Sequence, residues 1–217
     1  MTTFLIATRN AHKVGEIRAI LGAAFDFLTL NDFPGAPPVD EDADTFAGNA
    51  TKKAVTLAHW LATQPAGGQR ARPDYVLADD SGLEVDALKG APGVHSARFA
   101  AAERKGNAPD ADNNAKLLRL LQTVPTAQRT ARFRCVIAIA PVAKERGEII
   151  PPATQLFEGA CEGRIQLAPS GRSGFGYDPL FIPRGFDQSF AELGEDTKNR
   201  LSHRGQALSE MKARFHG

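Results

Sequence analysis

The chain has 217 residues, enough to bury a sizeable core, and with 42% hydrophobic and 24% charged residues it has the composition of an ordinary globular protein. Its formal net charge of +1 gives no broad basic face, so we expect no nucleic-acid partner. No apolar stretch approaches the ~20 residues that cross a bilayer, and the N-terminus lacks a signal-peptide pattern, which predicts a cytoplasmic protein without a membrane partner. Cys135 and Cys161 have no metal-ligand spacing, so we interpret them as core residues in a reducing compartment.

The first quarter of the chain alternates strand and helix patterns. An apolar run at residues 3–8 predicts an interior strand, and helical spacing that stops at Gly22 follows the polar stretch TRNAHK. FDFLTL, residues 25–30, predicts a second strand, which leads into a loop rich in proline and acidic residues. We expect Asp44 or Thr45 to cap the helix that follows.

The middle of the chain contains an unusual pair of charges. The composition of residues 64–74 predicts a loop, and the apolar run at 75–78 predicts a buried strand. This strand is expected to end at Asp79 and Asp80, because a turn-forming Ser-Gly pair follows them. A helix is then predicted at residues 113–124.

The remaining elements define the fold class. Residues 130–142 and 156–167 predict two paired strands, joined through a loop that contains Pro151 and Pro152, and residues 202–215 predict a final helix. Helices and strands interleave, and at least one strand pair is antiparallel by this interpretation. We therefore predict a single α/β domain with a mixed sheet.

The loop after the first predicted strand offers ligands for an anion. A loop that leaves a strand and begins a helix presents free backbone amides, and the helix dipole favours negative charge there. Thr8, Asn10 and Lys13 add a hydroxyl, an amide and an ammonium group, which suit phosphate oxygens. The glycine pattern of a P-loop is absent, so the alternative is an ordinary polar loop with a solvent-facing lysine.

Carboxylates cluster in two places that the fold could bring together. Magnesium takes one or two protein carboxylates while phosphates and water supply its other ligands, and Glu41 with Asp80 would meet that need. The alternative is that the acids of the loop, Asp40, Glu41, Asp42 and Asp44, are merely solvated and that Asp79 caps a turn.

The third polar cluster lies towards the C-terminus. SGFGYDPLF places Phe175 and Tyr177 on either side of Gly176, so a flat base could approach the backbone and stack on a ring. The donors Lys198, Ser202, His203 and Arg204 follow near the start of a helix, where Arg or His can donate to a purine oxygen. The alternative is an aromatic turn packed on the core and a basic helix start on the surface.

Four blocks in this order resemble the signatures of the inosine/xanthosine triphosphate pyrophosphatase family: ATRNAHKVGEI, ADDSGLEVDALKGAPGVHSARF, FGYDPLF and SHRGQAL. The resemblance covers nearly the whole chain. It implies an elongated mixed β-sheet with flanking helices, in two lobes around a central nucleotide-binding cleft, and a homodimer. It also implies hydrolysis of non-standard purine nucleoside triphosphates (ITP, dITP and XTP) to the monophosphate and pyrophosphate, which keeps them out of DNA and RNA, with Mg²⁺ as the cofactor.

The resemblance also implies roles for individual residues. Asp80 is similar to the family's catalytic acid, which accepts a proton and binds the metal, and Glu41 is similar to the second metal carboxylate. Lys53, in NATKKA, is similar to a further lysine that faces phosphate and is expected to act in catalysis. Arg9 stands where many members have glycine or asparagine, and its bulk or charge would alter the loop.

The same resemblance implies the substrate contacts. Phosphate is expected to bind at Thr8, Arg9, Asn10 and Lys13, and the rest of the nucleotide at Ser81, Phe175, Gly176, Tyr177, Asp178, Lys198, His203 and Arg204. Two rival functions remain open at this stage, a magnesium-dependent phosphatase that releases orthophosphate and a nucleotide sensor without turnover. The identity of the phosphate product separates the first rival from a pyrophosphatase.

Overall fold

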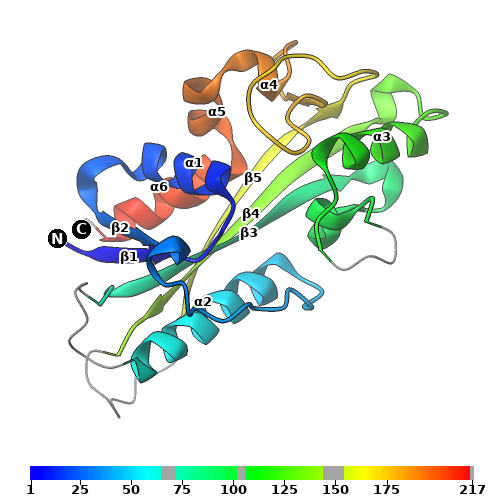
Figure 1. The fold of residues 1–217 in the computed structure, drawn as a ribbon. Helices are drawn as coiled ribbons and strands as arrows, with labels where there is room; N and C mark the ends of the chain where they lie inside the picture. The colour runs from blue at the N-terminus through cyan, green and yellow to red at the C-terminus, as the bar shows by residue number, and fades with distance from the viewer. Residues whose placement is uncertain (65–71, 102–105, 144–153, 216–217) are drawn as a thin grey trace. The chain divides into compact units, whose positions relative to one another are not determined.

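The computed structural model describes residues 1–64, 72–101, 106–143 and 154–215 (Figure 1). The predicted loop with Pro151 and Pro152 lies outside the described residues, as does most of the loop predicted at 64–74.

The chain forms two compact units. The first consists of Met1–Asp80, Val136–Glu158 and Ala207–Gly217, and the second of Ser81–Cys135 and Gly159–Gln206. Within the described residues, no helix has both the length and the hydropathy needed to cross a bilayer.

Six strands form one mixed sheet in the order β2-β1-β3-β4-β5-β6, which confirms the predicted α/β class. Strand β1 pairs in parallel with both β2 and β3, whereas β5 and β6 pair antiparallel. The predicted neighbours β4 and β5 lie side by side in this order. The strands are β1 Thr3–Ile6, β2 Asp26–Thr29, β3 Tyr75–Val85, β4 Thr130–Pro141, β5 Gln155–Ile165 and β6 Phe181–Pro183.

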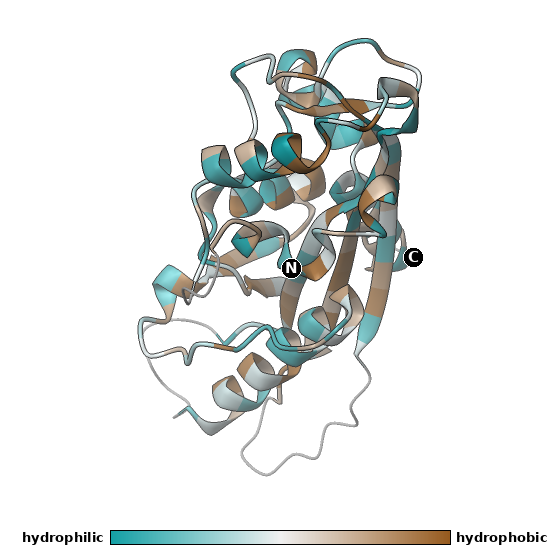
Figure 2. Cartoon of the chain, turned by 90° about the vertical axis from the view of Figure 1, so that its right-hand side faces the viewer, coloured by the Kyte–Doolittle hydropathy of each residue, from teal (hydrophilic) through white to brown (hydrophobic). Residues whose placement is uncertain are grey.

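Helices cover both faces of the sheet in the first unit. Figure 1 shows α2 (Phe46–Thr63) below the strands, and α1 (Ala11–Leu21) and α6 (His203–Phe215) above them. A strand covered on both faces needs apolar residues at every position, and Phe4, Leu5 and Ile6 of β1 are all buried. The apolar colour of Figure 2 accordingly follows the central strands.

The start of α2 confirms the predicted cap. The hydroxyl of Thr45 accepts a hydrogen bond from the backbone N–H of Gly48 at 3.0 Å, which satisfies one of the amides left free at a helix start. Asn49 and Lys53 follow at a spacing of four residues and are both buried. The helix therefore presents these two polar side chains on one inward face.

Strand β3 corrects the sequence prediction. The strand continues through Ser81 and Gly82 to Val85, and Asp79 caps no turn, because its carboxylate is paired with Lys13. The Ser-Gly pair stays extended because the strand goes on as a buried run in which Leu83 and Val85 are fully enclosed. Asp79 and Asp80 are thus interior strand residues, 2% and 5% exposed.

The second unit has its own core. Side chains from β3, β4, β5 and α3 (Asp110–Leu120) pack with the segment around Tyr177 and with Phe190. Phe133, Phe181 and Phe190 form an aromatic group whose ring centroids lie 4.7 to 6.1 Å apart. The sequence patterns did not predict the short elements β6, α4 (Phe190–Leu193) and α5 (Glu195–Leu201) of this unit.

Other boundaries moved by a few residues, and the cysteines behave as predicted. Strand β1 ends at Ile6 because the chain turns there, and Thr8 N–H donates to the oxygen of Ile6 at 3.0 Å. Helix α3 begins at Asp110, three residues before the predicted start. Cys135 and Cys161 are free and buried, as the sequence predicts.

Candidate functional site

The loop after β1 is shaped by the side chains that the sequence predicts for phosphate binding. Asn10 caps α1, since its Oδ1 accepts hydrogen bonds from the backbone N–H groups of His12 at 2.9 Å and Lys13 at 3.2 Å. The hydroxyl of Thr8 accepts from the N–H of Asn10 at 3.1 Å. Arg9 is exposed. The loop therefore fixes the start of α1. The positive end of the helix dipole lies at this loop, next to the exposed Arg9.

The ammonium group of Lys13 pairs with the carboxylate of Asp79. The side chain of Asp79 is 1% exposed, so its charge is held in a low-dielectric setting and requires this partner. Lys13 remains 16% exposed. An ammonium group fixed in this way can contact an incoming anion without leaving its carboxylate.

The end of β1 leaves one edge of β3 open beside the two aspartates. Ile6 and Leu77 are the last paired residues, and Ala7 N–H donates to the oxygen of Leu77 at 2.8 Å. Carbonyls alternate along a strand, so the oxygen of Asp79 points to the same side, beyond the last residue of β1. The ammonium group of Lys53 occupies that place and donates to Asp79 O at 2.7 Å.

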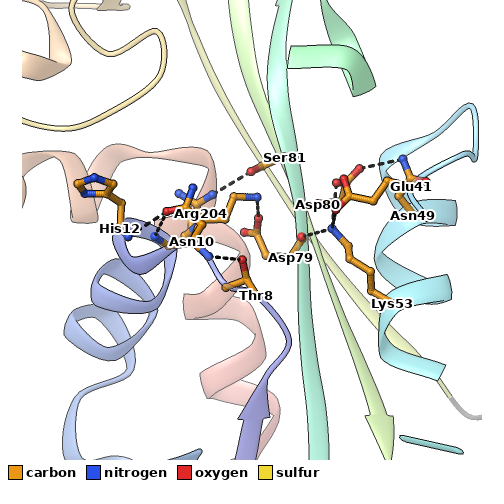
Figure 3. A network of polar contacts seen from close by, with 11 residues as sticks. Thr8, Asn10, His12, Glu41, Asn49, Lys53, Asp79, Asp80, Ser81 and Arg204 are labelled. Atoms are coloured by element: carbon orange, nitrogen blue, oxygen red, sulfur yellow. Dashed lines mark hydrogen bonds and ion pairs between the residues drawn. The ribbon is translucent and has the colours of Figure 1, made fainter. Parts of the chain in front are cut away.

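Asp80 belongs to a second cluster, on the opposite face of β3 from Asp79 (Figure 3). Its Oδ1 lies 3.1 Å from Lys53 Nζ, and Glu41 Oε1 lies 3.2 Å from the same nitrogen. The amide of Asn49 donates to Asp80 Oδ2 at 3.3 Å. Two predicted metal ligands thus converge on one cation, the ammonium group of Lys53.

Burial and charge act in opposite directions on this cluster. Burial raises the pKa of Asp80 above its ordinary value and outweighs the lowering by Lys53 and Lys13. Burial alone lowers the pKa of Lys53, but the charges of Asp80, Glu41 and Asp79 together raise it. The lysine is therefore fully charged at neutral pH. Burial destabilises the ionised form of Asp80, and a further cation would stabilise it.

The chemistry of the donors fits a hard divalent cation. Within the described residues, no three carboxylate, histidine or cysteine side chains gather as a complete protein-made metal site. Magnesium does not require one, because it is commonly held by one or two carboxylates and by substrate phosphates. The neighbouring acid Asp42 instead pairs with Lys52 at 2.6 Å on the surface, which leaves Glu41 as the loop acid beside Asp80.

The loop at residues 174–178 is the centre of the second unit's polar group. Asp178 is 2% exposed and accepts hydrogen bonds from the backbone N–H of Phe175 at 2.8 Å and from Lys198 Nζ. The same ammonium group lies 4.6 Å from the centre of the Phe175 ring. Asp178 therefore orients both a flat ring and a cation that the sequence predicts as substrate contacts.

Two further predicted contacts, His203 and Arg204, are buried in the second unit. Arg204 is 1% exposed and donates to Ser81 Oγ at 2.8 Å, and its guanidinium group lies 5.9 Å from the Phe175 ring. The His203 ring stacks on Phe133 with centroids 4.8 Å apart and 10° between the planes. Packing and hydrogen bonding restrict the orientations of these side chains.

Tyr177 has a structural position in this group. Its hydroxyl donates to the main-chain oxygen of Ser96 at 2.9 Å, and the side chain packs in the core. Burial and the charge of Asp110 raise the pKa of its phenol, so the hydroxyl stays protonated and keeps this bond.

The sequence reasoning missed two residues that shape these clusters. Asn49 was given no role, although its amide bonds Asp80 and both main-chain groups of Ala43, at 2.9 and 3.3 Å. Its position four residues before Lys53 was the signal available. Asp79 was left between a site role and a cap, and the structure pairs its carboxylate with Lys13.

Comparisons with known proteins agree over the whole length of the chain. A model of the Ham1 family matches residues 4–214. A dITP/XTP pyrophosphatase of Desulforamulus reducens is 47% identical over 207 residues, which cover 95% of this chain and 92% of the relative. One from Shouchella clausii is 43% identical and covers 100% of this chain and 98% of its own.

Solved structures give the same result. A HAM1 protein from Coxiella burnetii matches with a TM-score of 0.79 and 34% identity, over 100% of this chain and 99% of that one. A nucleoside-triphosphatase / dITP/XTP pyrophosphatase from Mycobacterium abscessus matches with a TM-score of 0.70 and 34% identity, over 97% and 98%. With the family match over nearly every residue, the chain belongs to the Ham1 family.

Proposed function

We propose that this protein is a nucleoside triphosphate pyrophosphatase that hydrolyses ITP, dITP and XTP to the monophosphate and pyrophosphate. The observation that carries the proposal is the convergence of Glu41 and Asp80 on Lys53, at 3.2 and 3.1 Å, beside the pair of Lys13 and Asp79. Lys13 and Lys53 are both paired with carboxylates beside the open edge of β3, and their two ammonium groups can bind the negative charges of a polyphosphate. Relatives that share 43–47% of their residues with this chain carry the name dITP/XTP pyrophosphatase.

The reaction needs one proton acceptor and a way to stabilise the leaving group. The oxygen of a water molecule bonds to the α-phosphorus while the bond from that phosphorus to the bridging oxygen breaks, and pyrophosphate leaves. Asp80, whose carboxylate is paired with Lys53, accepts the proton of the attacking water. Lys13 and Lys53 stabilise the negative charge on the departing pyrophosphate.

Magnesium is the cofactor in this proposal, with Asp80 and Glu41 as its protein ligands. Bound there, it would neutralise phosphate charge and lower the pKa of a coordinated water. The supporting observation is that both carboxylates already face one cation, the ammonium group of Lys53. Lys53 would then exchange a contact with a carboxylate for a contact with phosphate. Its hydrogen bond to Asp79 O would keep the ammonium group in place.

Base selection is assigned to the second unit. Phe175 offers a ring face for stacking, and Lys198, His203 and Arg204 supply donors for the 6-oxo group of hypoxanthine or xanthine. Adenine presents an amino group at that position, which would leave those donors unpaired at a cost of about 1–3 kcal/mol per buried group. The enzyme therefore favours ITP and XTP over ATP.

Three further properties belong to the same proposal. We expect a homodimer that acts in the cytoplasm and removes non-standard purine nucleotides before polymerases incorporate them into DNA or RNA. A nucleotide is the expected partner, with no nucleic acid or membrane. Size-exclusion chromatography with light scattering measures the mass directly, against 23.2 kDa for one chain.

The test of the function is product analysis with four substrates. The purified protein and Mg²⁺ are incubated separately with ITP, XTP, ATP and GTP, and pyrophosphate and orthophosphate are measured independently. The proposal predicts pyrophosphate from ITP and XTP and little from ATP. GTP shares the 6-oxo group, so we expect its rejection to come from its 2-amino side. Orthophosphate as the first product, or equal use of all four substrates, would contradict it.

A further inference from the structure

Helix α3 holds both main-chain groups of Gly176, in the loop that carries Phe175. The carboxylate of Asp110 accepts a hydrogen bond from Gly176 N–H at 2.6 Å, and the amide of Asn114 donates to Gly176 O at 3.0 Å. Asp110 and Asn114 are four residues apart, so they lie on one face of the helix. Sixty-six residues separate Asp110 from Gly176 in the sequence, so the contact is a tertiary one.

This loop requires such support because of its backbone. Gly174 and Gly176 have φ angles of 75° and 62°, in the left-handed region that glycine enters most readily. Glycine also gives the unfolded or loosened chain the greatest freedom, so a loop with two of them is costly to order. The two bonds from α3 fix the residue directly after Phe175, and Asp178 fixes Phe175 itself through its N–H at 2.8 Å.

The helix is itself firmly anchored and can act as a support. Asn113 is 2% exposed, accepts from Ala100 N–H at 2.7 Å and donates to the oxygen of Ala97 at 3.2 Å. Leu117 and Leu121 are fully buried in the core of the second unit. Asn113 therefore fixes the helix in place, and the neighbouring Asn114 fixes the loop.

We infer that Asp110 and Asn114 are positioning residues for base discrimination, acting through the Gly176 backbone on the ring of Phe175 and on the ammonium group of Lys198 above it. The inference rests on the proposed function, because it concerns the base that the second unit selects. Neither side chain needs to touch the nucleotide. Their effect is to keep the ring and its donor in the arrangement that a 6-oxo purine requires, before the substrate arrives.

The test compares Asp110→Ala with Asp112→Ala. Both residues are exposed acids in the first turn of α3, so each substitution removes a similar favourable charge from the helix start. Only Asp110 bonds the loop. We expect kcat/KM for ITP to fall about tenfold in Asp110→Ala, mostly through KM, while kcat/KM for ATP changes less than twofold, since one hydrogen bond corresponds to roughly that factor. Asp112→Ala should match the parent for both substrates.

Two additional measurements separate positioning from general destabilisation. Asp110→Asn keeps an acceptor for Gly176 N–H and should restore most of the preference for ITP. Calorimetry should show weaker binding of inosine monophosphate to Asp110→Ala but unchanged binding of pyrophosphate. Asn114→Ala is expected to behave like Asp110→Ala; because Asn114 is buried, its thermal unfolding is measured alongside.

The outcomes distinguish the inference from the function on which it rests. A parent protein that does not prefer ITP to ATP overturns the proposed function. A parent that prefers ITP, together with an Asp110→Ala variant that keeps the same ratio or loses kcat for both substrates equally, overturns the positioning role.

Discussion

Lys53 donates to the main-chain oxygen of Asp79 at 2.7 Å, in the position that β1 would occupy if it were longer. A backbone oxygen at the edge of a sheet needs a donor, and here a side chain from α2 provides it. The same ammonium group also contacts Asp80 and Glu41, so one nitrogen atom makes both a structural hydrogen bond and the contacts of the proposed catalytic cluster. Removing this lysine should therefore affect both stability and turnover.

Lys53→Met is predicted to lower the free energy of unfolding by about 3 kcal/mol, because it leaves Asp80 buried without its nearest cation. Turnover of ITP should fall at least a hundredfold, on the order of one lost transition-state donor. Denaturant unfolding and steady-state kinetics measure the two effects. Lys52→Met is the matched control, since Lys52 pairs with Asp42 on the surface, where such a pair contributes little to stability. Equal behaviour of the two variants would show that the buried cluster has no special role.

Asp80→Asn is predicted to abolish turnover while leaving the fold intact. The sign of its stability effect follows from the pKa. Because the pKa of Asp80 is raised in the folded state, its ionised form opposes folding at neutral pH, and this opposition disappears as the pH falls through the folded pKa. Asparagine removes the titrating group, so the melting temperature of the variant should not show the parent's gain as the pH falls through this pKa. Parental rates of ITP hydrolysis in this variant would refute the assignment of the proton acceptor.

The sequence predicted most elements and the residue types of both clusters, but it did not predict which charges would pair. Local patterns identified five of the six strands and included Thr45 among two candidate caps, because these features depend on neighbouring residues. The end of β3 was placed too early, since the Ser-Gly pair favours a turn only where no tertiary packing opposes it. The pairing of Lys13 with Asp79 depends on residues 66 positions apart and on which face of β3 each side chain leaves.

Gly174→Ala should disrupt the second unit's polar group. A Cβ atom there would lie 2.2 Å from Asp178 Oδ2, and the φ angle of 75° is unfavourable for alanine. We expect Asp178 to lose its contacts with Phe175 and Lys198, and KM for ITP to rise at least tenfold. Gly15→Ala serves as the control, because Gly15 lies within α1 and nothing is within 4 Å of an added Cβ. That change should stabilise the protein by about 0.5–1 kcal/mol. A Gly174→Ala variant with parental KM would show that the loop tolerates another arrangement.

Cys161 should be unreactive in the folded protein. Burial, with a smaller contribution from Glu162, raises the pKa of its thiol from 9.0 to about 11. At pH 8 the reactive thiolate is then about one part in a thousand, compared with about one in ten for an ordinary thiol, and its fraction rises as the pH approaches 11. Alkylation followed by mass spectrometry should show slow labelling of the native protein and fast labelling in urea. Equal rates in both conditions would be inconsistent with this thiol's environment.

The reaction itself is tested most directly by hydrolysing ITP in water enriched in ¹⁸O and locating the label by mass spectrometry. Attack of water at the α-phosphorus, with Asp80 as the proton acceptor, predicts the label in inosine monophosphate and unlabelled pyrophosphate. Label in pyrophosphate would mean attack at the β-phosphorus, and labelled orthophosphate would mean attack at the γ-phosphorus. Either result would contradict the proposed reaction.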